Sequence, residues 1–188
     1  MPELYHLESF RQYEQLHFYT LRQEEEDGSL ARESLAENFF RRMQARSDLA
    51  WEFSIFKRLI RNLGNNCRSA LAANLLHHED SAKALPPNYP LRWLGGHSDE
   101  EDSAEQDSTL PGPGDIMFRL YCYPASDQTI ILFNGDWKTA RTPQQCPNVA
   151  PHFWFARAAG TELTRMRQRR EWYDAGPLLL PDTITLWL

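Results

Sequence analysis

The alternation of hydrophobic and polar positions predicts a β-hairpin over residues 117–133. Its two arms, 117–123 (MFRLYCY) and 129–133 (TIILF), are rich in β-branched and aromatic residues and flank the turn-forming stretch 124–128. Alternation gives the first arm two different faces, formed by Phe118, Leu120 and Cys122 and by Arg119, Tyr121 and Tyr123. The second arm is apolar throughout, which predicts a central strand covered on both faces.

The second arm leads into a polar, glycine-containing loop that carries Trp137, Lys138 and Arg141. A buried strand that ends in a loop with two cations and an aromatic side chain is a plausible position for a binding or catalytic site. The alternative interpretation is a core hairpin followed by a solvated basic turn.

Two helices are predicted between a first strand at residues 16–22 and this hairpin. Ser29 or Ser34 could cap the first helix, whose apolar face consists of Leu35, Phe39 and Met43. Ser47 marks the start of the second, whose apolar positions recur at spacings of three and four: Leu49, Phe53, Phe56, Ile60 and Leu63. Gly64, followed by two asparagines, predicts its end. The short connection predicts an antiparallel helical hairpin.

The other elements are predicted less sharply. Residues 67–76 are compatible with a short helix, 77–87 with an edge strand or extended segment, and 90–96 with a short strand. Residues 150–170 form a predicted helix with an apolar face of His152, Ala156, Ala159, Leu163 and Met166, and 183–188 a final strand. This order favours an α+β domain, in which the helical hairpin packs on one face of a largely antiparallel sheet.

Length and composition are consistent with a single domain over residues 1–188. Hydrophobic residues make up 41% of the chain, which suffices for a core. No apolar run approaches the roughly 20 residues of a membrane span, and the N-terminus lacks the pattern of a signal peptide. The three cysteines are odd in number and far apart, which predicts reduced thiols and a cytoplasmic location.

The formal net charge of −6 is concentrated in one segment. Residues 95–115 contain seven acidic residues and no lysine or arginine, so removing those seven charges leaves +1 for the remainder. With its serines, glycines and prolines, the stretch 95–114 is predicted to be an acidic flexible insertion. The acidic whole-chain pI therefore does not exclude a basic nucleic-acid-binding face elsewhere.

Several short motifs occur in a characteristic order. The first strand contains Phe18-Tyr19-Thr20-Leu21 and is followed by an acidic and glycine turn, and the predicted helices come next. The hairpin arm contains Phe118-Arg119-Leu120-Tyr121, and the second arm leads to Lys138-Thr139-x-x-Thr142-Pro143. In this order the motifs resemble the RelE/HigB-like toxins of type II toxin–antitoxin systems, especially the HigB-like branch.

The resemblance covers residues 16–152 and implies a RelE/HigB-like core, with 153–188 as a C-terminal helix and tail extension. This sequence departs from the family pattern in its long acidic insertion, in two additional residues before Lys138, and in Trp137, which replaces the second lysine of the family's pair. The resemblance implies a metal-independent, ribosome-associated mRNA endoribonuclease that needs no cofactor. It also implies an antitoxin protein as partner, with mRNA or the ribosome as further partners and no membrane association.

Metal-free RNA cleavage needs a base for the 2′-hydroxyl, cations for the charge that develops on phosphorus, and an acid for the leaving oxygen. The candidate catalytic residues are Lys138, Arg141, Arg119, Tyr121 and His152. The first three would supply cations, Tyr121 the acid, and His152 or His78 the base. The candidate RNA-binding residues are Trp137, His78 and Arg157, where Trp137 would stack on a base.

Each candidate also has an ordinary structural interpretation. Arg119 and Tyr121 could form a cross-strand pair, His152 could be a packing histidine, and the arginines of 157–170 could form a solvated helix face. A non-catalytic RelE/HigB-fold binding or regulatory protein is therefore the alternative function, and an unrelated α+β domain is a third. A metal site at His77, His78, Glu79 and Asp80 lacks the H-E-x-x-H spacing, and Cys146 with His152 lacks the sequence signature of a thiol nucleophile.

Overall fold

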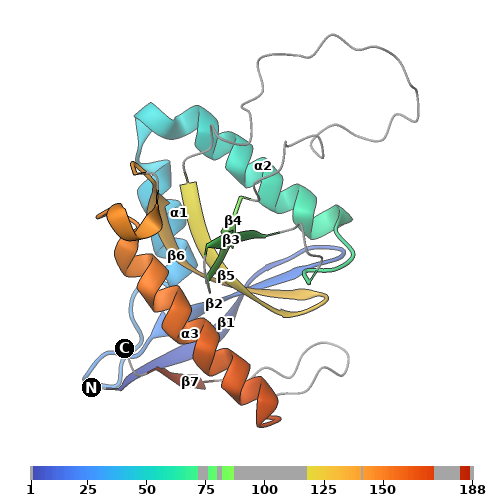
Figure 1. The fold of residues 1–188 in the computed structure, drawn as a ribbon, viewed down its shortest axis with the longest axis vertical. Helices are drawn as coiled ribbons and strands as arrows, with labels where there is room; N and C mark the ends of the chain where they lie inside the picture. Colours follow the sequence, from blue (N-terminus) through green and yellow to red (C-terminus); the bar gives the residue numbers. More distant parts are fainter. Residues whose placement is uncertain are drawn as a thin grey trace.

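The computed structural model describes residues 2–71, 76–79, 82–86, 118–140, 142–171 and 183–186. Within these ranges the chain forms a mixed α+β structure with three α-helices and one seven-stranded open sheet (Figure 1). The helices are α1 (Leu35–Gln44), α2 (Ala50–Asn66) and α3 (Ala150–Gln168). The strands are β1 (Glu3–Gln12), β2 (His17–Gln23), β3 (His77–Glu79), β4 (Ala82–Leu85), β5 (Phe118–Ser126), β6 (Thr129–Trp137) and β7 (Thr183–Leu186).

The sheet has the strand order β3-β4-β5-β6-β2-β1-β7. Neighbouring strands are antiparallel except for β2 and β6, which run parallel. The predicted largely antiparallel α+β arrangement is therefore confirmed, and so is the central position of β6. No helix in the described part of the chain is long and apolar enough to cross a membrane.

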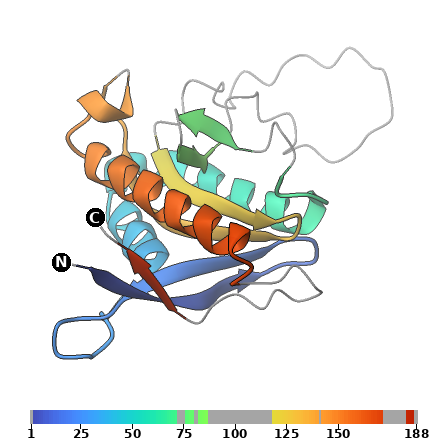
Figure 2. The same cartoon turned by 60° about the horizontal axis from the view of Figure 1, so that its bottom comes forward.

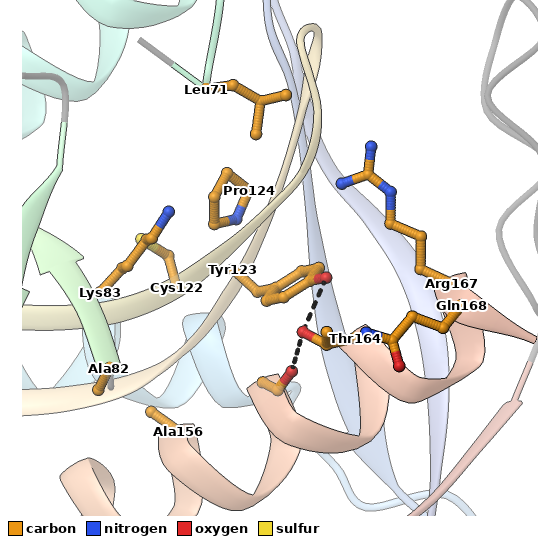
Figure 3. Close-up of a pocket in the computed structure, with 11 residues that line it drawn as sticks. Leu71, Ala82, Lys83, Cys122, Tyr123, Pro124, Ala156, Thr164, Arg167 and Gln168 are labelled. Atoms are coloured by element: carbon orange, nitrogen blue, oxygen red, sulfur yellow. Dashed lines mark hydrogen bonds between the residues drawn. The ribbon is translucent and has the colours of Figure 1, made fainter. Parts of the chain in front are cut away.

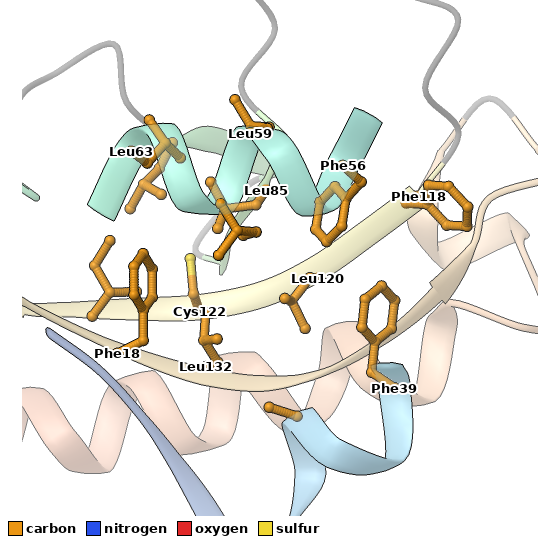
Figure 4. Close-up of a cluster of buried hydrophobic side chains, with 14 of the residues drawn as sticks. Phe18, Phe39, Phe56, Leu59, Leu63, Leu85, Phe118, Leu120, Cys122 and Leu132 are labelled. Carbon is orange, nitrogen blue, oxygen red and sulfur yellow. The ribbon is translucent and has the colours of Figure 1, made fainter. Parts of the chain in front are cut away.

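The helices cover both faces of the sheet (Figure 2). Helices α1 and α2 pack on one face, where Phe118, Leu120 and Cys122 of β5 meet Phe39 and Phe56 (Figure 4). Helix α3 packs on the other face. The two faces predicted for the first arm of the hairpin are thus confirmed.

The C-terminal elements are integrated into these layers. Helix α3 packs against β5 and β6 on the second face, and β7 pairs with β1 through Ile184 and Tyr5. Residues 153–188, predicted as an extension, therefore contribute part of the core where they are described. The predicted strand at 90–96 and the acidic insertion at 95–114 lie outside the described residues.

The hairpin differs from its prediction at both ends. Strand β5 continues through Pro124 to Ser126, so only Asp127 and Gln128 form the turn. Strand β6 continues to Trp137 through a segment predicted as a loop. Residues 67–71 form no helix, and β1 was not predicted because its mixture of half-buried and exposed residues lacks a clean apolar alternation.

Capping and close contacts explain two helix ends. Ser34 caps α1 in a reciprocal capping box with Glu37, which selects Ser34 over Ser29 as the start of the helix. The stop predicted at Gly64 and the two asparagines after it agrees with the end of α2 at Asn66, although Gly64 itself lies within the helix. A Cβ atom at position 64 would lie 2.2 Å from the ring of Tyr13, so this glycine admits the β1–β2 turn against the helix.

Gly135 lies where the backbones of β5 and β6 leave no room for a side chain. A Cβ atom there would lie 1.8 Å from the carbonyl oxygen of Arg119, where the pairing register shifts between Leu120 and Cys122. Gly160, within α3, has no such constraint, because its nearest contact would be the Tyr123 ring at 3.7 Å.

We expect Gly135→Ala to lower the free energy of unfolding by about 2–4 kcal/mol, because the added methyl group must displace the β5 backbone. The matched control is Gly160→Ala, which should raise stability by about 0.5–1 kcal/mol through helix propensity. Urea denaturation measures the free energy of unfolding of both variants. Equal values for Gly135→Ala and Gly160→Ala would contradict the steric explanation.

Candidate functional site

The candidate site lies where the two parallel strands separate. β2 and β6 pair from His17 with Thr129 to Thr20 with Leu132, and β6 then continues without β2 beside it. Helix α1 contacts both strands here, and its Ala36 amide donates a hydrogen bond to Thr20 Oγ1 at 3.1 Å. Binding sites often form beyond the carboxyl ends of adjacent parallel strands, at such a divergence.

Arg42, in the last turn of α1, joins that helix to the end of β6. Its guanidinium forms an ion pair with Asp136 and donates from Nη2 to Asn134 Oδ1 at 2.8 Å and to the Gly135 carbonyl at 2.6 Å. Its Nε donates to Asn38 Oδ1 at 2.9 Å. The side chains of Arg42 and Asp136 are 28% and 16% exposed, so the pair is half-buried and partly screened.

His152 approaches this pair from the first turn of α3. The pKa of His152 is lowered to about 4, first by burial and second by the nearby Arg42 charge, while Asp136 partly opposes both effects. The imidazole is therefore neutral at pH 7 and can accept a proton. Helices from opposite faces of the sheet thus contribute to one electrostatic cluster, made of Arg42, Asp136 and His152.

Two further cationic side chains lie near the same end of the sheet. Arg119 of β5 is opposite Asp136 in the strand register, and its Nη1 donates to the Phe118 carbonyl at 2.8 Å. Lys138 follows β6 directly and is only 8% exposed. A buried ammonium group requires polar or charged contacts, so Lys138 is held within the protein rather than displayed as a mobile surface cation.

Trp137 is positioned by a cation–π contact. The guanidinium of Arg46 lies 5.1 Å from its ring centroid, and Arg46 also pairs with Asp48 at 2.6 Å. The indole packs partly against the core on the face covered by α1 and α2. A nucleobase stacking on this ring would have to use the area that Arg46 leaves uncovered.

Tyr121 does not belong to the candidate site. Its side chain is fully buried beneath α3, with its ring centroid 6.1 Å from that of Phe153. The alternation of β5 placed it on the predicted face, but that face is covered by α3. A leaving oxygen of RNA cannot reach this hydroxyl, so we withdraw Tyr121 as the proton donor.

The remaining candidates are not assembled around His152. His78 is exposed on edge strand β3, three strands from β6, a separation of about 14 Å. The guanidinium of Arg157 lies over the rings of Phe153 and Trp154 on α3, at 5.8 and 5.0 Å from their centroids. Arg141 lies outside the described residues.

Sequence reasoning missed Arg42 and Asp136, which form the centre of the cluster. Arg42 follows Phe39 by three positions, so helical periodicity places it near the border of the apolar face of α1. That signal could have identified Arg42 as half-buried. It could not have identified the partner, because Asp136 is 94 residues away in the chain.

No protein-family model, no curated protein and no solved structure matches this chain. Among the residues that the structure describes, no three histidine, cysteine or acidic side chains are grouped so that they could hold a metal ion. The chemistry of the site must therefore be argued from the cluster itself.

The depressed pKa of His152 predicts a loss of stability in acid. The unfolded chain binds a proton near pH 6.5, and the folded chain only near pH 4. Between these values the unfolded state holds more protons, so stability falls as the pH falls, by about 2–3 kcal/mol for this group. Urea denaturation between pH 7 and 4 should show that the free energy of unfolding falls less in His152→Gln than in the wild type. An equal fall in both proteins would contradict the depressed pKa of His152.

The pKa of His152 should also depend on Arg42. Arg42→Met removes a positive charge and leaves Asp136 in place, so we expect the pKa of His152 to rise above about 4. Titration of the imidazole resonances by NMR measures it. Arg61→Met is the matched control, because Arg61 is exposed on α2, and it should leave the His152 titration unchanged. Equal titrations of wild type and Arg42→Met would show that the charges of Arg42 and His152 are not coupled.

Proposed function

We propose that this chain is a toxin-like component of a type II toxin–antitoxin or defence module, and that it is a metal-independent, ribosome-associated mRNA endoribonuclease. The observation that carries the proposal is the neutral His152 next to the Arg42–Asp136 ion pair at the end of β6. Three further cationic side chains lie near that end of the sheet, namely Arg46, Arg119 and the buried Lys138. A cationic region with an internal base suits the binding and cleavage of a phosphodiester.

The order of elements supports the proposed RelE/HigB-like fold. A strand, two helices and a central hairpin occur in the order that the sequence motifs imply, and both helices lie on one face of the sheet. Strand β1, the α3 layer and β7 are additions to that core. The fold proposal thus rests on topology together with the motifs, and the activity proposal rests on the charge cluster.

In the proposed reaction, His152 takes the proton from a ribose 2′-hydroxyl. The 2′-oxygen then attacks the adjacent phosphorus, and the bond from phosphorus to the 5′-oxygen breaks. The products are a 2′,3′-cyclic phosphate and a 5′-hydroxyl, with the leaving oxygen protonated by solvent because Tyr121 is inaccessible. The bound phosphate raises the pKa of His152 towards neutrality, which makes it a stronger base.

The same cationic region would be the target of an antitoxin. A partner segment rich in carboxylates would neutralise the arginines and exclude RNA at once. In this proposal the antitoxin protein and the mRNA on the ribosome compete for one surface.

A non-catalytic binding or regulatory protein of the same fold is the second candidate. Two observations favour it: Arg42 is already neutralised by Asp136, and a pKa of about 4 makes His152 a weak base until an anion binds. In that case the cations would hold an anionic partner without cleaving it.

The deciding experiment is inducible expression in a bacterium, with growth measured and the 5′ ends of cellular mRNA mapped. We expect growth arrest and new, translation-dependent cleavage sites. His152→Gln should reduce cleavage by about 100-fold or more, since it removes the base and keeps a polar side chain. Arg119→Gln should also weaken it, because a charge for the phosphate is lost.

Arg61→Gln is the matched control, because Arg61 is exposed on α2 and should be dispensable. Cleavage by purified protein and ribosomes should persist in a chelator of divalent metals at concentrations that leave ribosomes intact. Normal growth with intact mRNA, from soluble folded protein, would reject the nuclease and favour the binding protein. Full cleavage by His152→Gln would reject this site.

A further inference from the structure

A pocket with several polar lining residues lies on the α3 side of the molecule, where β4 begins. Strand β4 pairs with β5 only along Leu120–Cys122, so the rest of β5 has no described strand on that side. The space between this free edge and the second half of α3 is a pocket of about 420 Å³ (Figure 3). This volume is within the range of small-molecule sites in proteins.

Three elements supply its polar lining. Lys83 comes from β4, Tyr123 from β5, and Thr164, Arg167 and Gln168 from α3. Among the described lining residues the charged ones are Lys83 and Arg167, and both are cationic. Figure 3 shows them on opposite sides of the Tyr123 ring. The lining therefore combines an aromatic surface with positive charge at two points.

The Tyr123 ring is fixed by a hydrogen-bond chain. Thr164 Oγ1 donates its single proton to the Gly160 carbonyl at 2.7 Å. The Tyr123 hydroxyl lies 3.2 Å from the same Thr164 oxygen, so Tyr123 is the donor in that contact. The ring is thus held by its hydroxyl, whose proton is engaged by Thr164.

Gly160 keeps the wall of the pocket open. A glycine within a helix costs about 0.5–1 kcal/mol relative to alanine, and packing does not require it here, because a Cβ atom would make only an ordinary contact with Tyr123. Gly160 is one of the residues that line the pocket. At this position it leaves room beside the aromatic ring.

We propose that this pocket binds a nucleoside phosphate, with the base on the Tyr123 ring and the phosphate between Lys83 and Arg167. Aromatic rings bind bases through stacking, and lysine and arginine bind phosphate through charge and hydrogen bonds. Gln168 supplies amide groups for the polar edge of a base. The ligand class follows from this combination of one ring, two cations and an amide.

The pocket is separate from the cluster at the end of β6. Thr164 is twelve residues after His152 on the same helix, a distance of about 18 Å. The inference therefore does not rest on the proposed endoribonuclease, and variants can test the two sites independently.

Isothermal titration calorimetry of the full chain with AMP, GMP, CMP and UMP tests the pocket. We expect saturable binding of at least one nucleotide, and affinity lower by about tenfold or more in Lys83→Gln and in Arg167→Gln. Arg165→Gln is the control, because Arg165 is on the same helix but lines a different groove with Trp154. His152→Gln should bind as the wild type does.

Gly160→Leu should abolish binding without lowering the melting temperature, because leucine fills the space and favours the helix. The proposal is overturned if no nucleotide binds at millimolar concentration, or if inorganic phosphate binds as tightly as the nucleotides. It is also overturned if binding survives in both Lys83→Gln and Arg167→Gln, or if it is lost in His152→Gln.

Discussion

The parallel pairing of β2 with β6 is the contact on which the rest of the structure depends. It joins two hairpins, β1–β2 and β5–β6. The residues that pair between β2 and β6 are more than one hundred positions apart in the chain. Forming it requires closure of a long loop, an entropic cost that apolar burial on both faces must offset. Where this pairing stops, α1 contacts both strands and brings Arg42 to the end of β6.

The Arg42–Asp136 ion pair consequently has both a structural and an electrostatic role. It fixes the last turn of α1 to β6, and its two charges act in opposite directions on the pKa of His152. A half-buried pair of this kind contributes modest net stability, yet removing one partner leaves the other poorly compensated. A ligand phosphate or an acidic partner would enter an environment already adjusted by these two charges.

Much of the local structure could be predicted from sequence. The two faces of β5, the Ser34 cap and the helix beginning at residue 150 all follow from short-range periodicity and capping chemistry. Gly64 shows what such signals leave out, because the glycine near the helix end also admits the Tyr13 ring, a contact that local sequence does not reveal. Tyr121 is the corresponding case in the candidate site, because alternation assigns it to a face of β5 but does not reveal that α3 covers that face.

The sequence by itself determined most of the helices and the two arms of the central hairpin, which of their faces are apolar, and that a cationic segment follows the buried strand. These properties depend on side-chain types a few positions apart. The tertiary structure alone decided that α3 covers Tyr121, that Arg42 meets Asp136, and that His152 joins them from the opposite face. Such contacts depend on strand order and on which helix covers each face, and neither is encoded in local periodicity.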